Sequence, residues 1–274
     1  MSDQKRPKQS QSEQPGDESA MQPAPEIIRD SYRPADKLRD KVAIITGGDS
    51  GIGRAVALAC ADHGAEVLIQ GRDETALEGL YDEIVSGSAA QPGIIPLDLA
   101  HQDASPYEAL SEELQAAGVR LDGLIHNASI LGERKALAQT SVQSWHEVMQ
   151  ININAIFLLT RALMPLLEAA PSASIVLTSS GVGRRGKAYW GAYAVSKFAT
   201  EGFMQVLADE LAATSNIRVN SLNPGAVNTS MRRAAYPGEP PDTNPAPSEL
   251  TQAWIYLMSD ASREIHGQAL SAQA

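Results

Sequence analysis

The sequence of 274 residues contains one cysteine, and aromatic residues make up 5% of it. A single thiol excludes a disulfide framework within the chain. No run of about 18 uncharged apolar residues occurs, and the N-terminal segment lacks the apolar core of a signal peptide. These absences predict a soluble protein of a reducing compartment, the cytoplasm, with no membrane-spanning helix. The five histidines lie on different predicted elements without ligand spacing, so no metal site is expected (63, 101, 126, 146 and 266).

Positive charge is also scarce. The chain has 22 Lys and Arg residues against 33 Asp and Glu residues, which gives a formal net charge of -11. A chain this acidic repels phosphate backbones, so nucleic acid is not an expected partner.

Residues 1–40 differ in composition from the rest. They contain five prolines, seven basic and eight acidic residues, and one apolar pair, Ile27–Ile28. Such a segment buries too little apolar surface to offset its conformational entropy, so it is predicted to be a mobile tail. The alternative is that it lies across a neighbouring subunit. Residues 41–274 are predicted to form a single domain.

From Lys41 onward, apolar runs of strand length alternate with amphipathic runs of helix length. The predicted strands are 42–46, 66–70, 93–97, 122–126, 174–179, 217–222 and 268–272. The predicted helices begin with an apolar-faced segment around 52–60 and continue at about 73–86, 104–117, 141–169, 190–213 and 248–259. Continuous Val, Ile and Leu runs are typical of parallel strands covered on both faces. The pattern predicts an α/β fold of the Rossmann type, a doubly wound parallel sheet of about seven strands.

A glycine-rich turn follows the first strand and opens the first helix, at 46–54 (TGGDSGIGR). Glycines at 47, 51 and 53 permit a tight turn and let a pyrophosphate approach the backbone. The free N–H groups of the next helix would then bind that phosphate. A glycine turn alone is weak evidence, but its place between a buried strand and a helix predicts a dinucleotide site.

The end of the second strand bears on which dinucleotide binds. An acidic residue there would accept hydrogen bonds from the ribose and repel a 2′-phosphate. The chain has Gly71 at that position, followed by Arg72, whose guanidinium can pair with a phosphate. NADP is therefore predicted. NAD is the alternative if Asp73 acts at the ribose instead of capping the following helix.

Tyr193 and Lys197 lie four residues apart in a predicted helix, which places both on one face. A nearby ammonium favours the phenolate, so it would bring a tyrosine toward the working range of a general acid–base. Ser180, at the exit of the strand before this helix, could hold a carbonyl oxygen near the phenol. Together with the phosphate loop, this set points to catalysis.

These motifs jointly resemble the classical short-chain dehydrogenases/reductases over residues 41–272. The matching segments are TGGDSGIG (46–53), HNAS (126–129), NINA (152–155), Ser180, YAVSK (193–197), and NPG (223–225) followed by Thr229. The first part resembles a long-tailed bacterial aldehyde-reductase subgroup, and the remainder resembles another small bacterial oxidoreductase subgroup.

The resemblance implies roles for individual residues. Tyr193 would be the general acid–base, Ser180 would polarise the substrate oxygen, and Lys197 would bind the nicotinamide ribose and lower the tyrosine pKa. Asn152, in a kinked helix, would hold a water that relays protons to Lys197. The implied cofactor-binding set is Gly47, Asp49, Ser50, Gly51, Ile52, Gly53, Arg72, Asp98, Leu99, Asn127, Ala128, Tyr193, Lys197, Pro224, Gly225, Val227 and Thr229.

The sequence departs from the family pattern at three places. Ser129 stands where the family usually has glycine, Ser50 where it usually has a basic residue, and the C-terminal segment HGQALSAQA lacks the usual glycine pair. Residues 230–247 are predicted to be a mobile lid. The basic loop with Arg184, Arg185 and Lys187 is either a solvated surface or attracts acidic substrates or a cofactor phosphate.

The expected activity is NADP-dependent reduction of a carbonyl or aldehyde substrate without a metal. The expected pocket is partly apolar and includes Val182, Tyr189, Trp190, Ala226 and Met231. The alternatives are an NAD-dependent alcohol dehydrogenase of the same family and a non-catalytic dinucleotide sensor. The resemblance implies a homo-oligomer, a tetramer or dimer, joined through helices 141–169 and 190–213.

Overall fold

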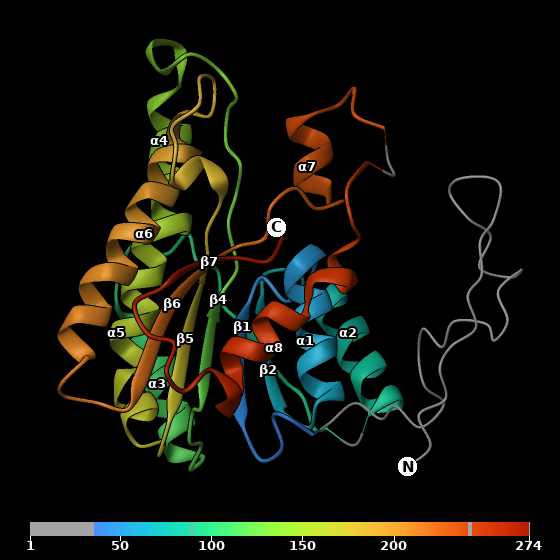
Figure 1. Ribbon diagram of the computed structural model, residues 1–274, viewed down its shortest axis with the longest axis vertical. Coiled ribbons are helices and arrows are strands. Elements are labelled where there is room, and N and C mark those ends of the chain that lie inside the picture. The colour runs from blue at the N-terminus through green and yellow to red at the C-terminus, as the bar shows by residue number, and fades with distance from the viewer. Residues whose placement is uncertain (1–35, 89, 241–242, 274) are drawn as a thin grey trace, which may run out of the picture. The chain divides into compact units, whose positions relative to one another are not determined.

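The computed structural model describes residues 36–88, 90–240 and 243–273. Its centre is a seven-stranded parallel sheet, as the sequence predicts, and the strand order is β3-β2-β1-β4-β5-β6-β7 (Figure 1). The strands are β1 (Val42–Thr46), β2 (Glu66–Gly71), β3 (Gly93–Pro96), β4 (Gly123–His126), β5 (Ala173–Thr178), β6 (Ile217–Asn223) and β7 (Ala269–Ser271).

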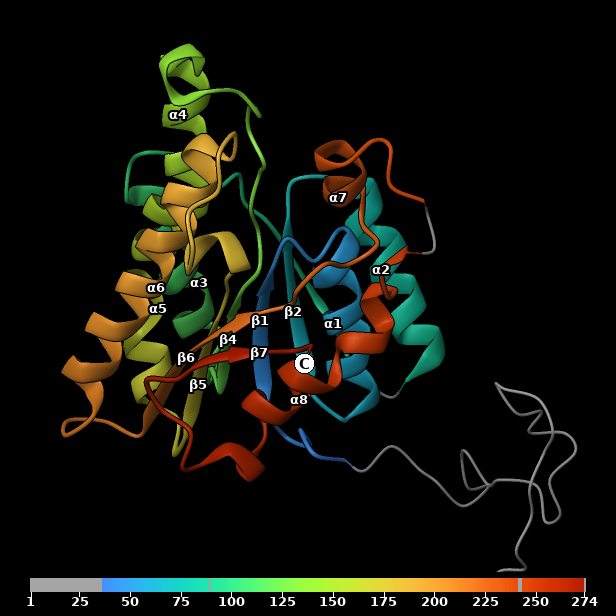
Figure 2. The same ribbon diagram turned by 45° about the horizontal axis from the view of Figure 1, so that its top comes forward.

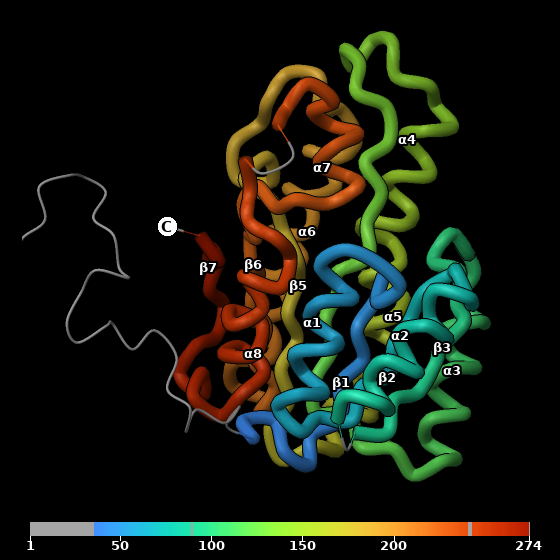
Figure 3. The backbone as a smooth tube through the Cα atoms, turned by 90° about the vertical axis from the view of Figure 1, so that its right-hand side faces the viewer, coloured from blue at the N-terminus to red at the C-terminus, as the bar shows by residue number. Residues whose placement is uncertain are grey.

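Helices cover both faces of the sheet. One face is covered by α1 (Gly51–Asp62), α2 (Glu74–Gly87) and α8 (Gln252–Met258), and the other by α3 (Ser105–Ala116), α5 (Ala155–Glu168) and α6 (Gly191–Leu211). Figure 2 shows these two layers on either side of the strands, and in Figure 3 the layer of α1, α2 and α8 faces the viewer. Neighbouring residues of β1 illustrate the reason: Ile44 belongs to one buried apolar cluster and Ile45 to the other. Because strand side chains alternate between faces, a continuous apolar run fills both cores.

The folded unit begins before the predicted boundary at residue 41. Leu38 is 1% exposed and packs in the α1-side core, and its N–H donates to the His63 carbonyl over 2.9 Å. The predicted tail is therefore shorter than residues 1–40, and its remaining part, 1–35, lies outside the described residues. Cys60 on α1 is fully buried, as the helical spacing predicts, and burial raises the pKa of its thiol to about 12.

The long predicted helix 141–169 is interrupted. It consists of α4 (Val142–Met149), a π-helical segment η3 (Gln150–Asn154) and α5. By length and composition the span from Val142 to Glu168 could cross a membrane, but 61% of its most apolar window is buried inside this fold. Its burial is that of a core helix packed on a sheet.

A second difference concerns the predicted lid, 230–247, which contains a short helix, α7 (Ser230–Ala235). Thr229 caps it, since its hydroxyl accepts a hydrogen bond from the Arg232 N–H. Residues 241–242 of this segment lie outside the described residues.

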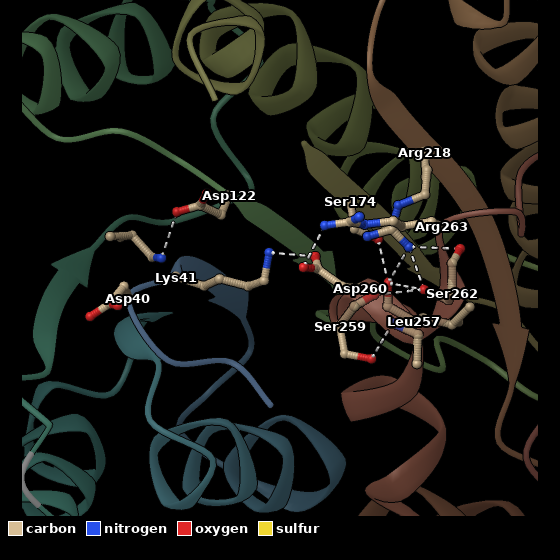
Figure 4. Close-up of polar contacts among 12 residues, drawn as sticks. Asp40, Lys41, Asp122, Ser174, Arg218, Leu257, Ser259, Asp260, Ser262 and Arg263 are labelled. Carbon is tan, nitrogen blue, oxygen red and sulfur yellow. Dashed lines mark hydrogen bonds and ion pairs between the residues drawn. The ribbon is translucent and has the colours of Figure 1, made fainter. Parts of the chain in front are cut away.

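Polar side chains join the sheet to the end of α8 at the edge where the strands begin (Figure 4). The guanidinium of Arg218, near the start of β6, donates to the carbonyls of Leu257 and Ser262. Lys41, before β1, pairs with Asp260 over 3.2 Å. These contacts fix the amino-terminal edge of the sheet and leave the opposite edge for a binding site.

Candidate active site

A cleft of about 300 Å³ lies at the carboxyl ends of the strands. It is lined by the turns after β1, β3, β4 and β6 and by the last residues of β2 and β5. Open parallel sheets bind ligands at this edge, where connections leave in opposite directions from neighbouring strands.

Most residues that the sequence assigns to the site meet in this cleft. Its lining includes Gly47, Asp49, Ser50, Gly51, Ile52, Arg72, Asp98, Leu99, Asn127, Ala128, Tyr193, Lys197, Pro224 and Thr229. Five other assigned residues do not line it, namely Gly53, Asn152, Ser180, Gly225 and Val227.

The glycine turn is shaped by close approaches of the backbone. Gly47 and Gly51 adopt φ values of 64° and 54°, which favour glycine. A Cβ at Gly53 would stand 2.0 Å from the Gly47 carbonyl oxygen, so this position admits no side chain. The following helix, α1, begins after Ser50, whose side chain makes no capping hydrogen bond. The first N–H groups of α1 therefore have no side-chain cap at the cleft.

Gln70, at the end of β2, supports this turn and was not among the predicted residues. Its side-chain oxygen accepts from the Gly47 N–H over 3.3 Å, and its amide nitrogen donates to the Leu97 carbonyl over 2.5 Å. The sequence signal for Gln70 is a polar residue near the end of an otherwise apolar strand.

The end of β2 carries an uncompensated positive charge. Arg72 is exposed, lines the cleft and has no ion pair within the described part of the chain. Asp73 caps α2, because its carboxylate accepts from the Ala76 N–H over 3.1 Å. The prediction that Asp73 is a helix cap is thus confirmed.

Asn127 ties β4 to β1 beside the cleft. Its N–H donates to the Thr46 hydroxyl over 2.9 Å, and its amide nitrogen donates to the Thr46 carbonyl over 3.1 Å. This places Asn127 and the adjoining Ala128 against the glycine turn.

Tyr193 is buried at the start of α6, and two serine hydroxyls reach its phenol. Burial raises the pKa of Tyr193, whereas hydrogen bonds with Ser180 and Ser129 lower it to a smaller extent. Ser129, the residue that replaces the family's usual glycine, thus gives the phenol a second hydroxyl partner. The sequence shows the substitution but not this contact.

Lys197 is 2% exposed and lies one turn further along α6. Its Nζ donates to the Thr178 carbonyl over 2.8 Å and stands 5.7 Å from the centre of the Tyr193 ring. Burial lowers the pKa of Lys197 to about 8, and the nearby Glu201 carboxylate opposes that decrease. Lys197 is not among the groups that shift the pKa of Tyr193 in this structure, so the expected lowering of the tyrosine pKa by this ammonium stays a prediction.

Asn152 lies in the π-helical segment η3 and is fully buried. Its side-chain oxygen accepts from the Ile130 N–H over 2.8 Å, and its nitrogen donates to the Ile130 carbonyl and to the Ser196 hydroxyl. The Ser196 hydroxyl in turn donates to the Tyr193 carbonyl over 2.8 Å. Asn152 thereby links the turn after β4 to the helix that carries Tyr193.

Two further supports come from outside the predicted set. The buried Glu201 carboxylate accepts hydrogen bonds from Ser179, Ser221 and Arg184, which joins α6 to the ends of β5 and β6. Near the end of the chain, the Gln273 amide donates to two carbonyls of the loop after β6, those of residues 224 and 226. Side-chain directions of this kind follow from the folded loops and give no sequence pattern.

Comparisons with known proteins agree with this site. Residues 41–240 match the family described as short chain dehydrogenase. The chain is 42% identical over 243 residues to the uncharacterized oxidoreductase YciK of Escherichia coli K12, a match that covers 88% of this chain and 96% of YciK.

Solved structures are similar as well. A short chain dehydrogenase from Pseudomonas syringae is 50% identical with a TM-score of 0.85, covering 87% of this chain and 96% of that one. A short chain dehydrogenase from Escherichia coli CFT073, complexed with NADPH, is 42% identical with a TM-score of 0.84, covering 87% and 99%. On this evidence the chain belongs to the short-chain dehydrogenase family and is an oxidoreductase.

Proposed function

We propose that this oxidoreductase uses NADPH to reduce a carbonyl or aldehyde substrate, with Tyr193 as proton donor. The observation that carries the proposal is the buried phenol of Tyr193, which lines the cleft beside a buried lysine whose Nζ lies 5.7 Å from the tyrosine ring centre, in the same cleft as the glycine turn. Because its pKa is raised, the phenol stays protonated at neutral pH, which suits a group that gives a proton to a substrate oxygen.

The cleft fits a dinucleotide. Gly53 in the glycine turn admits no side chain, the first N–H groups of α1 lack a side-chain cap, and the buried Thr178 hydroxyl has no partner within the described residues. The residues that would hold the cofactor are the cleft-lining set given above, with Asn127 at the glycine turn and Thr229 beside Gly51.

When bound, NADPH supplies the two electrons and the hydrogen that reduce the carbonyl carbon. Ser180 holds the substrate oxygen near the phenol, and Tyr193 transfers its proton to that oxygen. Because the pKa of Lys197 is about 8, most of this side chain is protonated at neutral pH. Its ammonium then stabilises the phenolate left behind. Asn152 positions this machinery through its hydrogen bond to Ser196, and we assign it the further role of holding a water that relays a proton to Lys197.

NADPH is favoured over NADH by Arg72, an exposed cation on the cleft with no ion pair in the described chain, and by the NADPH complex of the similar enzyme from Escherichia coli. Titration with each nucleotide, followed by nicotinamide fluorescence, tests this preference. We expect tighter binding of NADPH, lost in Arg72→Ala. Equal NADPH affinity in the wild type and in Arg72→Ala would show that Arg72 does not contribute to the preference. A preference of the wild type for NADH would refute the assignment of NADPH.

Catalysis is tested separately with Tyr193→Phe. This variant keeps the ring and its packing, so nucleotide binding should persist while turnover of aldehydes is lost. Retained turnover would refute the assignment of the proton donor. Nucleotide binding without turnover of any carbonyl compound by the wild type would favour a dinucleotide sensor.

We also propose that the chain forms homo-oligomers through α4, α5 and α6. Large apolar side chains are exposed on these helices, at Val142, Phe157, Val195, Phe198 and Val206. Because α4, α5 and α6 pack on the same segment η3, so many exposed large apolar side chains on them are more typical of a subunit interface than of a free surface. Light scattering after size exclusion should give a dimer or tetramer, reduced to monomer by Phe157→Glu; a monomeric wild type would refute this.

A further inference from the structure

An aromatic and cationic cluster adjoins Tyr193. Trp190, immediately before α6, has its ring centre 5.6 Å from that of Tyr193 and 6.0 Å from that of Tyr236. The guanidinium carbon of Arg134 lies 4.5 Å from the Trp190 ring centre and 5.0 Å from the Tyr236 ring centre. On the other side, the Lys187 ammonium is 3.0 Å from the Tyr236 hydroxyl. The Trp190 ring therefore lies between Arg134 and Tyr193, the proposed proton donor. Lys187 is connected to Tyr193 through two rings, those of Tyr236 and Trp190.

These two cations have no counter-ion. Within the described ranges, no ion pair includes Arg134 or Lys187. The third cation at the Tyr236 ring, Arg232, is neutralised by two hydrogen bonds to Glu239. A local excess of positive charge thus stands beside the site of a chain whose formal net charge is -11.

Part of the Arg134 guanidinium is also shielded from water. Its Nε and the indole nitrogen of Trp190 are buried, and neither has a hydrogen-bond partner in the described part of the chain. One guanidinium nitrogen donates to the Ala235 carbonyl, which holds the group in place. A fixed charge with low access to water is weakly screened, so it acts strongly on charges placed nearby.

The position of the cluster separates it from the proposed phosphate sites. Trp190, Tyr193 and Ala235 pack with Met231, which lines the cleft at its substrate side. The phosphate-binding turn and Arg72 come from β1 and β2, on other elements. In the basic loop, Arg184 is bound by Glu201 and by the Leu270 carbonyl, so it is a structural residue.

We infer that the substrate is an acidic carbonyl compound whose anionic group lies toward Arg134 and Lys187. This inference rests on the proposed reductase function and adds the substrate class to it. An anion on the substrate balances the local positive charge, whereas an uncharged analogue of the same shape gains no such attraction.

The test uses a matched pair of aldehydes, 4-carboxybenzaldehyde and methyl 4-formylbenzoate, reduced with NADPH by the full chain. We expect kcat/KM to favour the acid by at least about tenfold at low salt, a preference that falls as ionic strength rises. Arg134→Met keeps an apolar stem over Trp190 but removes the charge, and the acid-to-ester ratio should fall severalfold. Lys187→Met, at an exposed position, should lower the ratio without risk to folding. Lys135→Met is the matched control, because that lysine already pairs with Glu133.

An acid-to-ester ratio near one in the wild type, or a ratio unchanged in both Arg134→Met and Lys187→Met, would overturn the inference while leaving the reductase function standing. Binding of terephthalate to the enzyme with NADPH gives a readout that needs no turnover. Terephthalate binding that is lost in Arg134→Met would support the anion site even if neither aldehyde were reduced, in which case only the reductase proposal would fail.

Discussion

Glu201→Gln removes one negative charge from the interior of α6 while keeping the size and shape of the side chain. The carboxylate accepts hydrogen bonds from the Ser179 hydroxyl over 2.6 Å, the Ser221 hydroxyl over 2.5 Å and the Arg184 Nε over 2.9 Å. It also favours the protonated form of Lys197, one turn away on the same helix. The substitution should therefore change both the stability and the pH dependence of the enzyme.

The magnitudes follow from these contacts. A hydrogen bond to a charged group contributes about 1.5–3 kcal/mol, and the amide retains part of the network, so unfolding should become easier by roughly 1.5–3 kcal/mol. Opposite unit charges on side chains one helical turn apart interact by roughly 2 kcal/mol at an effective dielectric constant of about 20. Loss of that interaction lowers the pKa of Lys197 further below about 8. At about 1.4 kcal/mol per pKa unit, the alkaline limb of the reductase profile should then move toward acid by about 1.5 pH units.

The assay is kcat/KM for aldehyde reduction between pH 6 and 9.5, with urea denaturation of the same preparations. Glu210→Gln is the control, because Glu210 is exposed on the same helix and should leave both readouts unchanged. A loss of stability without any displacement of the alkaline limb would show that Glu201 is merely structural. An unchanged pH profile together with unchanged stability would show that the Glu201 carboxylate neither stabilises the fold nor raises the pKa of Lys197.

Three other variants test the scaffold of the site. The pKa of buried His126 is lowered to about 3, so the unfolded chain binds more protons than the folded chain below pH 6.5. The free energy of unfolding should therefore fall by about 2 kcal/mol from pH 7 to pH 5, and by less in His126→Gln. Denaturant titration at each pH measures this change. An equal pH dependence of the free energy of unfolding in the wild type and in His126→Gln would contradict this prediction. Gln273→Ala removes two hydrogen bonds to the loop after β6 and should weaken NADPH binding severalfold with little change in Tm; unchanged affinity would count against it. Gly53→Ala should lower the free energy of unfolding by about 1–3 kcal/mol and abolish NADPH binding. Gly79→Ala is the control, because Gly79 in α2 faces open space, and thermal melts should show unchanged or higher stability.

Much of the fold could be predicted because burial on both faces leaves a clear pattern. The strands and most helices begin and end within a few residues of the predicted positions. The spacing of Tyr193 and Lys197 and the glycine turn are local, so sequence shows them. The direction of a side chain at the end of a strand depends instead on how the next loop turns. For that reason the contact of Ser129 with the phenol and the support from Gln70 appear only in the structure.

The interruption of the helix at η3 (Gln150–Asn154) determines which side of α5 faces the sheet. Each residue of a helix turns the chain by about 100°, and a π turn contains one residue more than an α turn. Deleting a single residue here would restore a regular helix but would rotate the apolar stripe of α5, including Leu159 and Leu163, by about 100° away from the sheet. Asn152 would lose both of its hydrogen bonds to Ile130 in the same step. The length of the continuous helical segment from α4 to α5 is thus locked by one extra residue, so this segment can vary in sequence far more readily than it can vary in length.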